Sequence, residues 1–270
     1  MNKNQQDKTV RHETDEEPGT QSAPAEMKNQ TDEFTDDVSR PKVDLANLVL
    51  HGDVAVTNTF FKNADPCTAR GCKWPKSGSY VYVPYLISPG FSQKEKNIII
   101  RGMQSFNQAT CIRFVPKRSS HRDYINFFSQ SKGCWSNIGR QSGGQYISLE
   151  RKGCVHHSTV QHEILHALGF HHEQVRSDRD KHVRILFKNI QQRQRSNFKK
   201  VQTNNLVTPY DFTSVMHYGK YDFSKNGLPT IEAKSNPKQK FGNARQMSAN
   251  DIIRVNRLYK CNKFRQQRLY

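Results

Sequence analysis

The chain has 270 residues, of which 34% are hydrophobic, and its formal net charge is +18. Residues 1–62 carry 12 acidic and 7 basic side chains (net −5), whereas residues 63–270 carry 12 acidic and 35 basic side chains (net +23). No apolar run approaches membrane-spanning length, and no zinc-finger, RNP-type or helix-turn-helix pattern accompanies the basic charge, so we expect neither a membrane span nor a nucleic-acid partner. The acidic leader is either a segment that covers the basic body or a disordered tail.

The predicted elements begin after this polar leader. Residues 1–40 are rich in Asp, Glu, Gln, Thr and Lys, so we expect them to be disordered, with order starting near Val43. Alternating or short apolar runs predict strands at 80–87, 112–116, 124–128 and 145–149. Residues 94–110 predict a helix, and its apolar face consists of Ile98, Ile99, Gly102, Met103 and Phe106.

A second helix is predicted to start at Ser158. The Ser158 side chain can cap it, and Gln161 three residues later completes a capping-box pattern. The run VQHEILHALG follows, and Gly169 suits the left-handed conformation just past a helix end.

This predicted helix carries a metal-binding pattern. His162 and His166 lie four residues apart, so both imidazoles project from one face. Glu163 lies beside the first histidine, where it can take a proton from a metal-bound water. Gly169 turns the chain, so His172 can return as a third ligand. Three protein ligands leave a position for water, which is typical of catalytic zinc sites.

The alternative is a helix whose histidines are solvated or buried in the core. For this composition, a chance HExxH is expected in roughly 2% of such chains. Requiring the glycine and the third histidine at their spacing lowers the chance to roughly 1 in 25,000, which favours the zinc site.

Two segments resemble a known family. HEILHALGFHHEQVRSDRD resembles the signature of the astacins, a branch of the metzincin metalloproteases, and Ser214-Val215-Met216-His217-Tyr218 resembles their Met-turn, SxMHY. The resemblance implies an α+β metzincin domain with two lobes around an active-site cleft and an N-terminal propeptide. It implies that Met216 is a hydrophobic floor below the zinc and that Tyr218 is a weak fifth ligand that supports the oxyanion. Without the resemblance, Met216 would be interpreted as an ordinary core residue and Tyr218 as an ordinary surface phenol.

A third segment, Leu50-His51-Gly52-Asp53, resembles the astacin propeptide motif FxGD, with Leu50 in place of the usual Phe. The resemblance implies that Asp53 binds the zinc in the open position and keeps the enzyme latent, whereas the alternative is a plain Gly-Asp turn. The Lys62–Asn63 bond suits a trypsin-like activating protease. We therefore predict an acidic propeptide at residues 1–62 and an astacin-like catalytic domain at residues 63–270.

Glu173 follows the third histidine, at the position where astacins use a glutamate to tether the N-terminus of the matured enzyme. The resemblance therefore implies an ion pair between Glu173 and the new ammonium group of Asn63; the alternative is a surface carboxylate. The charged residues that follow predict a structural ion-pair cluster of Arg176, Asp178, Arg179 and Asp180.

The six cysteines all lie in the basic part and predict a disulfide framework in an oxidising compartment, with six reduced thiols as the alternative. Composition leaves the pairing open. The resemblance implies the pairs Cys67–Cys72, Cys111–Cys261 and Cys134–Cys154, as in the six-cysteine subgroup that includes teleost hatching (choriolytic) enzymes.

The function that the resemblance implies is a secreted, monomeric zinc metalloendopeptidase with one Zn²⁺ per subunit, made as a zymogen. It would hydrolyse proteins through zinc-bound water with Glu163 as the base, and its substrates would be zona-pellucida-type proteins of the egg envelope. Two alternatives are a nephrosin-like tissue protease and an inactive glycan- or matrix-binding protein. The first residues contain no apolar signal-peptide core, so we expect either an N-terminus further upstream or an unconventional export route, with storage in secretory granules as one option.

Overall fold

The computed structural model describes residues 48–57 and 71–262. These residues belong to one compact unit that runs from Pro41 to Tyr270. The predicted disorder of residues 1–40, the Lys62–Asn63 bond and Cys67 lie outside the described residues. Within the described ranges, no helix is long and apolar enough to cross a membrane.

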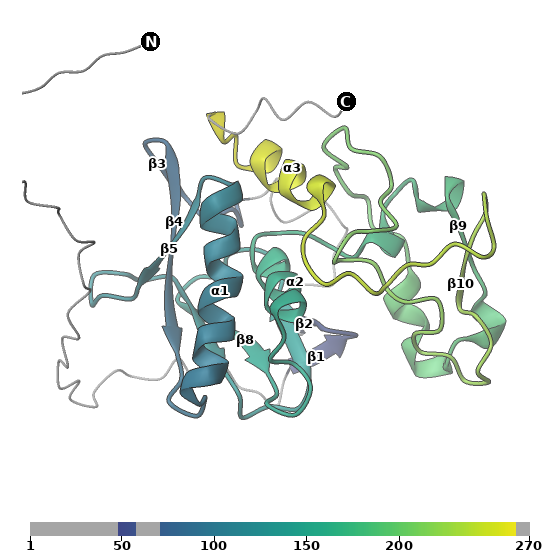
Figure 1. Cartoon of the computed structure of the whole chain (residues 1–270), viewed down its shortest axis with the longest axis horizontal. Coiled ribbons are helices and arrows are strands. Elements are labelled where there is room, and N and C mark those ends of the chain that lie inside the picture. Colours follow the sequence, from purple (N-terminus) through teal and green to yellow (C-terminus); the bar gives the residue numbers. More distant parts are fainter. Residues whose placement is uncertain (1–47, 58–70, 263–270) are drawn as a thin grey trace, which may run out of the picture. The chain divides into compact units, whose positions relative to one another are not determined.

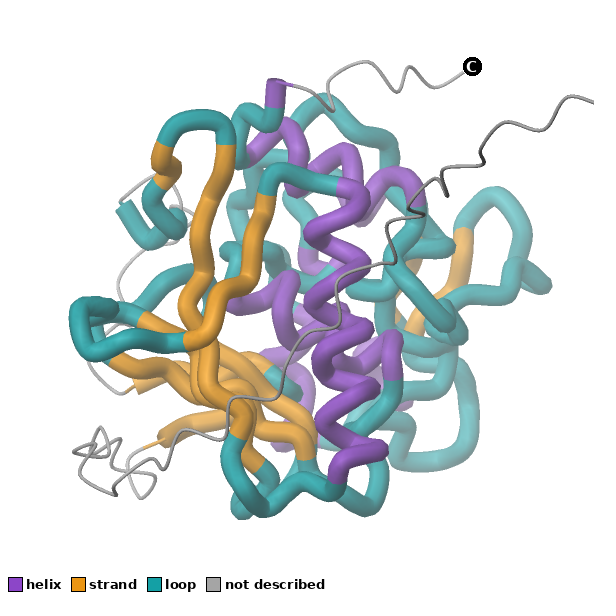
Figure 2. Tube along the Cα trace, turned by 60° about the vertical axis from the view of Figure 1, so that its left-hand side comes forward, coloured by secondary structure: helices purple, strands orange, loops and turns teal. Residues whose placement is uncertain are grey.

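One layer of the fold is an eight-stranded sheet, drawn in orange in Figure 2. Its strands lie in the order β1-β2-β7-β8-β6-β4-β3, with β5 beside β4. The bounds are β1 Leu48–His51, β2 Val54–Thr57, β3 Lys76–Ser77, β4 Tyr80–Ile87, β5 Ile112–Pro116, β6 Tyr124–Phe128, β7 Cys134–Asn137 and β8 Gly144–Leu149. The four strands predicted from apolar patterns are therefore confirmed as β4, β5, β6 and β8.

The outer edge of this sheet is made by the earliest described residues. Strands β1 and β2 form an antiparallel hairpin, and β2 runs parallel to β7 with Val54 opposite Ser136. On the other side of β7, β8 runs antiparallel to it. The hairpin therefore covers the edge of β7.

Helix α1 (Gln93–Ala109) lies against the sheet and against helix α2 (Figure 1). A capping box between Ser92 and Glu95 starts it. Its buried face, Ile99, Gly102, Met103 and Phe106, is the predicted one, with Ile98 only half-buried. A Cβ atom on Gly102 would lie 2.4 Å from Val160 Cγ1, so glycine is what lets α1 approach α2 so closely.

The predicted N-cap of the second helix is wrong. Helix α2 (His157–Ala167) begins one residue before Ser158, and its N-cap, His156, makes no side-chain capping bond. Gln161 does not fold back to the helix start. Its Nε2 donates to Ser105 Oγ at 2.7 Å, and its Oε1 accepts from the Met247 N–H at 2.8 Å. Tertiary contacts of Gln161 thus replace the capping box.

The predicted end of α2 is confirmed. Gly169 has a φ of +104°, and its N–H donates to the His166 carbonyl at 2.8 Å. The Phe170 N–H donates to the Leu165 carbonyl at 3.0 Å, which completes a Schellman motif. The helix therefore ends in a tight turn that sends the chain towards His172.

Much of the chain between α2 and α3 forms a second lobe with its own core, which includes Val183, Ile190, Phe198, Tyr210, Tyr218, Ile231 and Phe241. Its regular elements are short: η3 Glu173–Val175, η4 Arg179–Lys181, β9 Val183–Ile185, η5 Phe187–Asn189, η6 Gln192–Phe198 and β10 Ile231–Ala233. In Figure 1, β9 and β10 lie to the right of α2 and β3 to β5 to its left. Helix α3 (Ala249–Leu258) ends the described chain, and the α+β class is confirmed.

Two disulfides join the described elements. Cys111, at the start of β5, is bonded to Cys261 beyond α3. Cys134, at the start of β7, is bonded to Cys154 shortly before α2. These are pairs that the family resemblance implied. Cys72 is also disulfide-bonded, but its expected partner Cys67 is outside the described residues.

Candidate active site

Three histidines and one aspartate converge beside α2. Helix α2 supplies His162 and His166 from one face, and the turn at Gly169 returns the chain so that His172 faces them. The ring centroid of His166 lies 4.7 Å from those of both other histidines. Counting Asp53, the four ligand atoms all lie within 4.8 Å of one another.

Backbone contacts orient the imidazoles. Val215 O lies 2.8 Å from His162 Nδ1, and Phe170 O lies 2.8 Å from His166 Nδ1. A carbonyl can only accept, so each Nδ1 carries a proton and donates it, and each Nε2 is thereby turned towards the shared space. This is the arrangement by which proteins fix metal-binding histidines.

The electrostatics of the site favour a cation. Burial lowers the pKa of His166 to about 4, so its ring is neutral at pH 7. Burial would also lower the pKa of His162, but the Asp53 charge raises it to about 9. Asp53 thus stabilises positive charge beside the three imidazoles, and imidazole and carboxylate groups are both protein ligands of zinc. His162, His166, His172 and Asp53 could therefore hold a zinc ion.

Asp53 reaches this group from the turn of the β1–β2 hairpin. Its Oδ2 lies 3.0 Å from His162 Nε2, and its Oδ1 lies 2.8 Å from His172 Nε2. Its own carbonyl accepts from the Ser136 N–H of β7 at 3.0 Å, so the sheet edge holds it in place. Burial would raise the pKa of Asp53, but the neighbouring His172 and His162 hold it well below the usual value.

Gly52 makes this approach possible. Its φ of +69° is a left-handed conformation that other residues adopt only with strain. A Cβ atom at this position would lie 2.3 Å from the Tyr218 hydroxyl oxygen. The turn therefore needs glycine both for its backbone conformation and for its contact with Tyr218.

Glu163 lies beside His162 and is completely buried. Neither carboxylate oxygen has a hydrogen-bond partner among the described residues. Burial raises the pKa of Glu163 well above its usual value, and the Asp53 charge adds to the effect. A buried carboxylate with this pKa and without a partner is typical of a functional site.

Tyr218 and Met216 lie in the segment 214–218, which contains a turn. The Tyr218 ring is 4.5 Å from the His172 ring, and its buried hydroxyl has no hydrogen-bond partner in the described ranges. Met216 is 2% exposed, and its carbonyl accepts from the Glu173 N–H at 2.9 Å. The turn is therefore bonded directly to the chain segment that carries His172.

Residues of both lobes line the cleft. One pocket lies beside the carboxylate of Glu163, and its lining residues include Ser158, Thr159, Val215, His217, Gly242 and Ala244. A second pocket is lined by Tyr218, Asp222 and Phe223, among others. Asp53 and His162 line both pockets, so both adjoin the candidate metal site.

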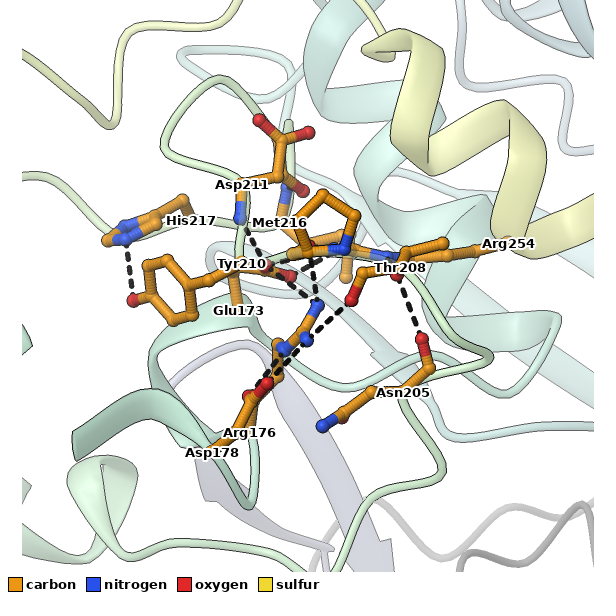
Figure 3. Close-up of polar contacts among 12 residues, drawn as sticks. Glu173, Arg176, Asp178, Asn205, Thr208, Tyr210, Asp211, Met216, His217 and Arg254 are labelled. Carbon is orange, nitrogen blue, oxygen red and sulfur yellow. Dashed lines mark hydrogen bonds and ion pairs between the residues drawn. The ribbon is translucent and has the colours of Figure 1, made fainter. Parts of the chain in front are cut away.

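Glu173 is buried in an ion-pair cluster (Figure 3). Arg254 donates to its two oxygens at 2.6 and 2.9 Å, and Arg176 donates to Oε1 at 3.2 Å. The Asp211 N–H also donates to Oε1, at 2.7 Å. Arg176 in turn donates twice to Asp178, both at 2.9 Å, so a predicted structural ion pair is present.

Sequence reasoning missed two residues of this region. Asp251 of α3 accepts from the Ser214 hydroxyl at 2.6 Å and from the Val215 N–H at 3.0 Å, and so holds the Met-containing turn. Arg254, one turn later, pairs with Glu173. The capping-box spacing of Ser248 and Asp251 could have predicted the start of α3. No local sequence pattern indicates that Asp251 bonds to the turn at Val215 or that Arg254 pairs with Glu173.

One helix carries two histidines placed to bind a metal, a third histidine follows a glycine turn, and a methionine-containing turn is bonded to both segments. This combination is typical of a metzincin-type metallopeptidase. Residues 68–260 match the sequence profile of the Astacin peptidase family. The chain belongs to the astacin family and is a metalloendopeptidase.

Similar proteins include choriolytic enzymes of Oryzias latipes. The low choriolytic enzyme is 44% identical over 79% of this chain and 78% of that protein. High choriolytic enzyme 2 is 45% identical over 85% of this chain and 83% of that protein. The solved structure of high choriolytic enzyme 1, a hatching enzyme zinc-protease, has a TM-score of 0.70 at 45% identity and covers 74% of this chain and 100% of that one.

Proposed function

We propose that the chain is the zymogen of a secreted, monomeric zinc endopeptidase with one zinc ion, held by His162, His166 and His172. The observation that carries the proposal is the convergence of three Nε2 atoms on one point, with Asp53 among them. When bound there, zinc would polarise the scissile carbonyl and lower the pKa of a water molecule.

The chain's own groups supply the remaining chemistry. Glu163 is the general base: it takes the proton of the attacking water and passes it to the leaving amine. Both of its carboxylate oxygens lack a hydrogen-bond partner among the described residues, which supports this role. The Tyr218 hydroxyl, which has no partner among the described residues, donates to the oxyanion. Met216, which is 2% exposed, would form the hydrophobic floor below the zinc.

Asp53 keeps the uncut chain inactive in two ways. Its carboxylate occupies the position beside the three histidines that the attacking water needs. The strand that follows it, β2, also pairs with the edge of β7, so an extended substrate cannot add to that edge. Cleavage at Lys62–Asn63 by a trypsin-like protease would separate the hairpin covalently from the catalytic domain.

Maturation would also create a new ammonium group on Asn63. Glu173 is the proposed tether for it, since its carboxylate is buried close to the ligand His172. In the uncut chain, however, this carboxylate already has Arg176 and Arg254 as partners, so the ammonium would join or displace an arginine.

The substrates we propose are egg-envelope proteins of the zona-pellucida type. The first support is the sequence identity of 44–45% to enzymes named choriolytic. The second is the net charge of +23 on residues 63–270, which suits acidic or glycosylated substrates. A tissue protease of the nephrosin kind would have the same catalytic site and differ in where it is expressed.

The test is proteolysis before and after trypsin activation. Purified full-length chain should degrade neither casein nor isolated egg envelope until trypsin has cut it, and a zinc chelator should abolish the activity. Glu163→Gln, activated in the same way, should bind zinc but lose at least ~10²-fold in kcat. If the activated chain cleaves casein but not the envelope, the proposed substrate is wrong and the proposed endopeptidase activity stands.

A further inference from the structure

Two buried residues beside the site, Tyr210 and His217, have no part in the chemistry described above. They are 8% and 5% exposed. The Tyr210 hydroxyl lies 2.8 Å from His217 Nε2, as Figure 3 shows, and His217 Nδ1 lies 2.7 Å from the backbone oxygen of Tyr218. His217 therefore links Tyr210 to the main chain of Tyr218.

The direction of both hydrogen bonds follows from the chemistry of the groups. The Tyr218 carbonyl can only accept, so His217 Nδ1 must carry a proton and donate it. In the neutral ring, Nε2 is then an acceptor, and the Tyr210 hydroxyl must be the donor. One tautomer and one ring orientation satisfy both bonds, so Tyr210 fixes the orientation of His217 through the hydrogen bond that it donates.

The side chain of Tyr218 depends on this support. Its hydroxyl has no hydrogen-bond partner in the described residues, so no polar contact at its own tip fixes it. Its position is set by ring contacts, with Phe223 at 5.4 Å and His172 at 4.5 Å, and by its main chain. The main chain is held at two points, the N–H by Gln174 Oε1 at 3.2 Å and the carbonyl by His217.

Tyr210 is itself held firmly. The His182 ring stacks on it with centroids 4.9 Å apart and planes 12° apart, and the Arg176 guanidinium lies 5.7 Å from the ring centroid. The backbone N–H of the next residue, Asp211, donates to the carboxylate of Glu173. In the sequence, Glu173 directly follows the proposed ligand His172. Tyr210 is thus attached to the ion-pair cluster around Glu173 (Figure 3).

We propose that Tyr210 and His217 are positioning residues: Tyr210 orients His217, and His217 holds the Tyr218 main chain so that its hydroxyl reaches the metal site. This rests on the proposed function of Tyr218 at the oxyanion. A misplaced oxyanion donor weakens transition-state stabilisation while leaving substrate binding nearly unchanged. The effect of losing Tyr210's hydroxyl should therefore fall on kcat.

The experiment is a double-mutant cycle on the trypsin-activated full chain. Tyr210→Phe removes one hydroxyl and keeps the ring. In the parent it should lower kcat about three- to ten-fold, as for one lost hydrogen bond, with KM within about two-fold. In a Tyr218→Phe background the same change should leave kcat unaltered, because the group that it positions is already gone.

Tyr259→Phe is the matched control, since Tyr259 is also buried and donates its hydroxyl to a carbonyl, that of Leu168. It should lower the melting temperature about as much as Tyr210→Phe and leave kcat unchanged. At His217, Asn should retain more activity than Leu, because its amide can still donate to the Tyr218 carbonyl.

The proposal is overturned if Tyr210→Phe lowers kcat by the same factor in both backgrounds, or does not lower it at all. It is also overturned if Tyr259→Phe causes an equal loss, because the effect would then reflect stability. These outcomes are separable from failure of the proposed function, which would appear as retained turnover in Glu163→Gln or in Tyr218→Phe alone.

Discussion

Substituting Gly52 by alanine should make the uncut chain leak activity. Gly52 has a φ of +69°, and a Cβ atom there would lie 2.3 Å from the Tyr218 hydroxyl. The left-handed conformation costs an alanine about 1–2 kcal/mol. The contact adds to this cost, because either the Tyr218 ring or the hairpin must move. Both terms act on the docked form of the β1–β2 hairpin and not on the form that has left the cleft.

The size of the effect follows from that free energy. A loss of about 1–2 kcal/mol in docking raises the undocked fraction about 5- to 30-fold. The initial rate of the uncut variant, divided by the rate of the same protein after trypsin, should rise by at least this factor over the parent. A serine-protease inhibitor in the assay excludes unintended activation.

Two controls make the result specific. After trypsin has removed residue 52, the Gly52→Ala protein should have the kcat and KM of the parent. Gly227→Ala introduces the same kind of strain, at a φ of +74° with no atom within 4 Å of the new Cβ, and should leave latency intact. If the uncut Gly52→Ala chain is as inactive as the parent, the hairpin tolerates both the strain and the contact, and Gly52 is not required for latency.

Further substitutions test residues of the proposed catalytic domain. Alanine at His162, His166 or His172 should each lower zinc content and abolish proteolysis; full metal occupancy by atomic absorption in any of them would remove that residue from the ligand set. Tyr218→Phe should lower kcat by about 10²-fold with little change in KM, and a near-parental rate would return Tyr218 to a structural role. Glu173→Ala should destabilise even the uncut chain by about 3–5 kcal/mol, because it takes from the buried Arg254 the carboxylate that accepts two of its hydrogen bonds. Glu232→Ala removes a partner from the exposed Arg184 pair and should change the melting temperature little.

The parts of the fold that the sequence predicted are those set by local patterns. Alternation of apolar residues located β4, and the apolar face of α1 was visible at helical spacing. Gly169 marked the end of α2 because a left-handed residue there is a local requirement. The capping prediction at Ser158 failed for the opposite reason: Gln161 bonds to α1 and to the segment before α3, and no local pattern reveals such partners.

The same distinction applies to the site. The spacing of His162 and His166 predicted two ligands on one helix face, and the structure brings His172 to them. Short strand β7, with only four residues, carries no periodic signal, so its pairing with β2 was not predicted. That pairing determines how Asp53, 109 residues before His162, enters the cleft.

The burial and charge of Glu173 limit which residues can be its long-range partners. A carboxylate that is 1% exposed needs cations, and the family resemblance offered only the future ammonium of Asn63. The structure supplies Arg254 from 81 residues away and Arg176 from the same loop. Each guanidinium also has a second carboxylate, because Asp178 lies 2.9 Å from Arg176 and Asp251 lies 3.7 Å from Arg254. Both Glu173 oxygens already accept hydrogen bonds from these arginines, so an arriving ammonium would compete for them. We therefore expect maturation to displace one arginine from Glu173, and Arg176 is the better candidate because Asp178 accepts two hydrogen bonds from it at 2.9 Å, which Asp251 does not do for Arg254.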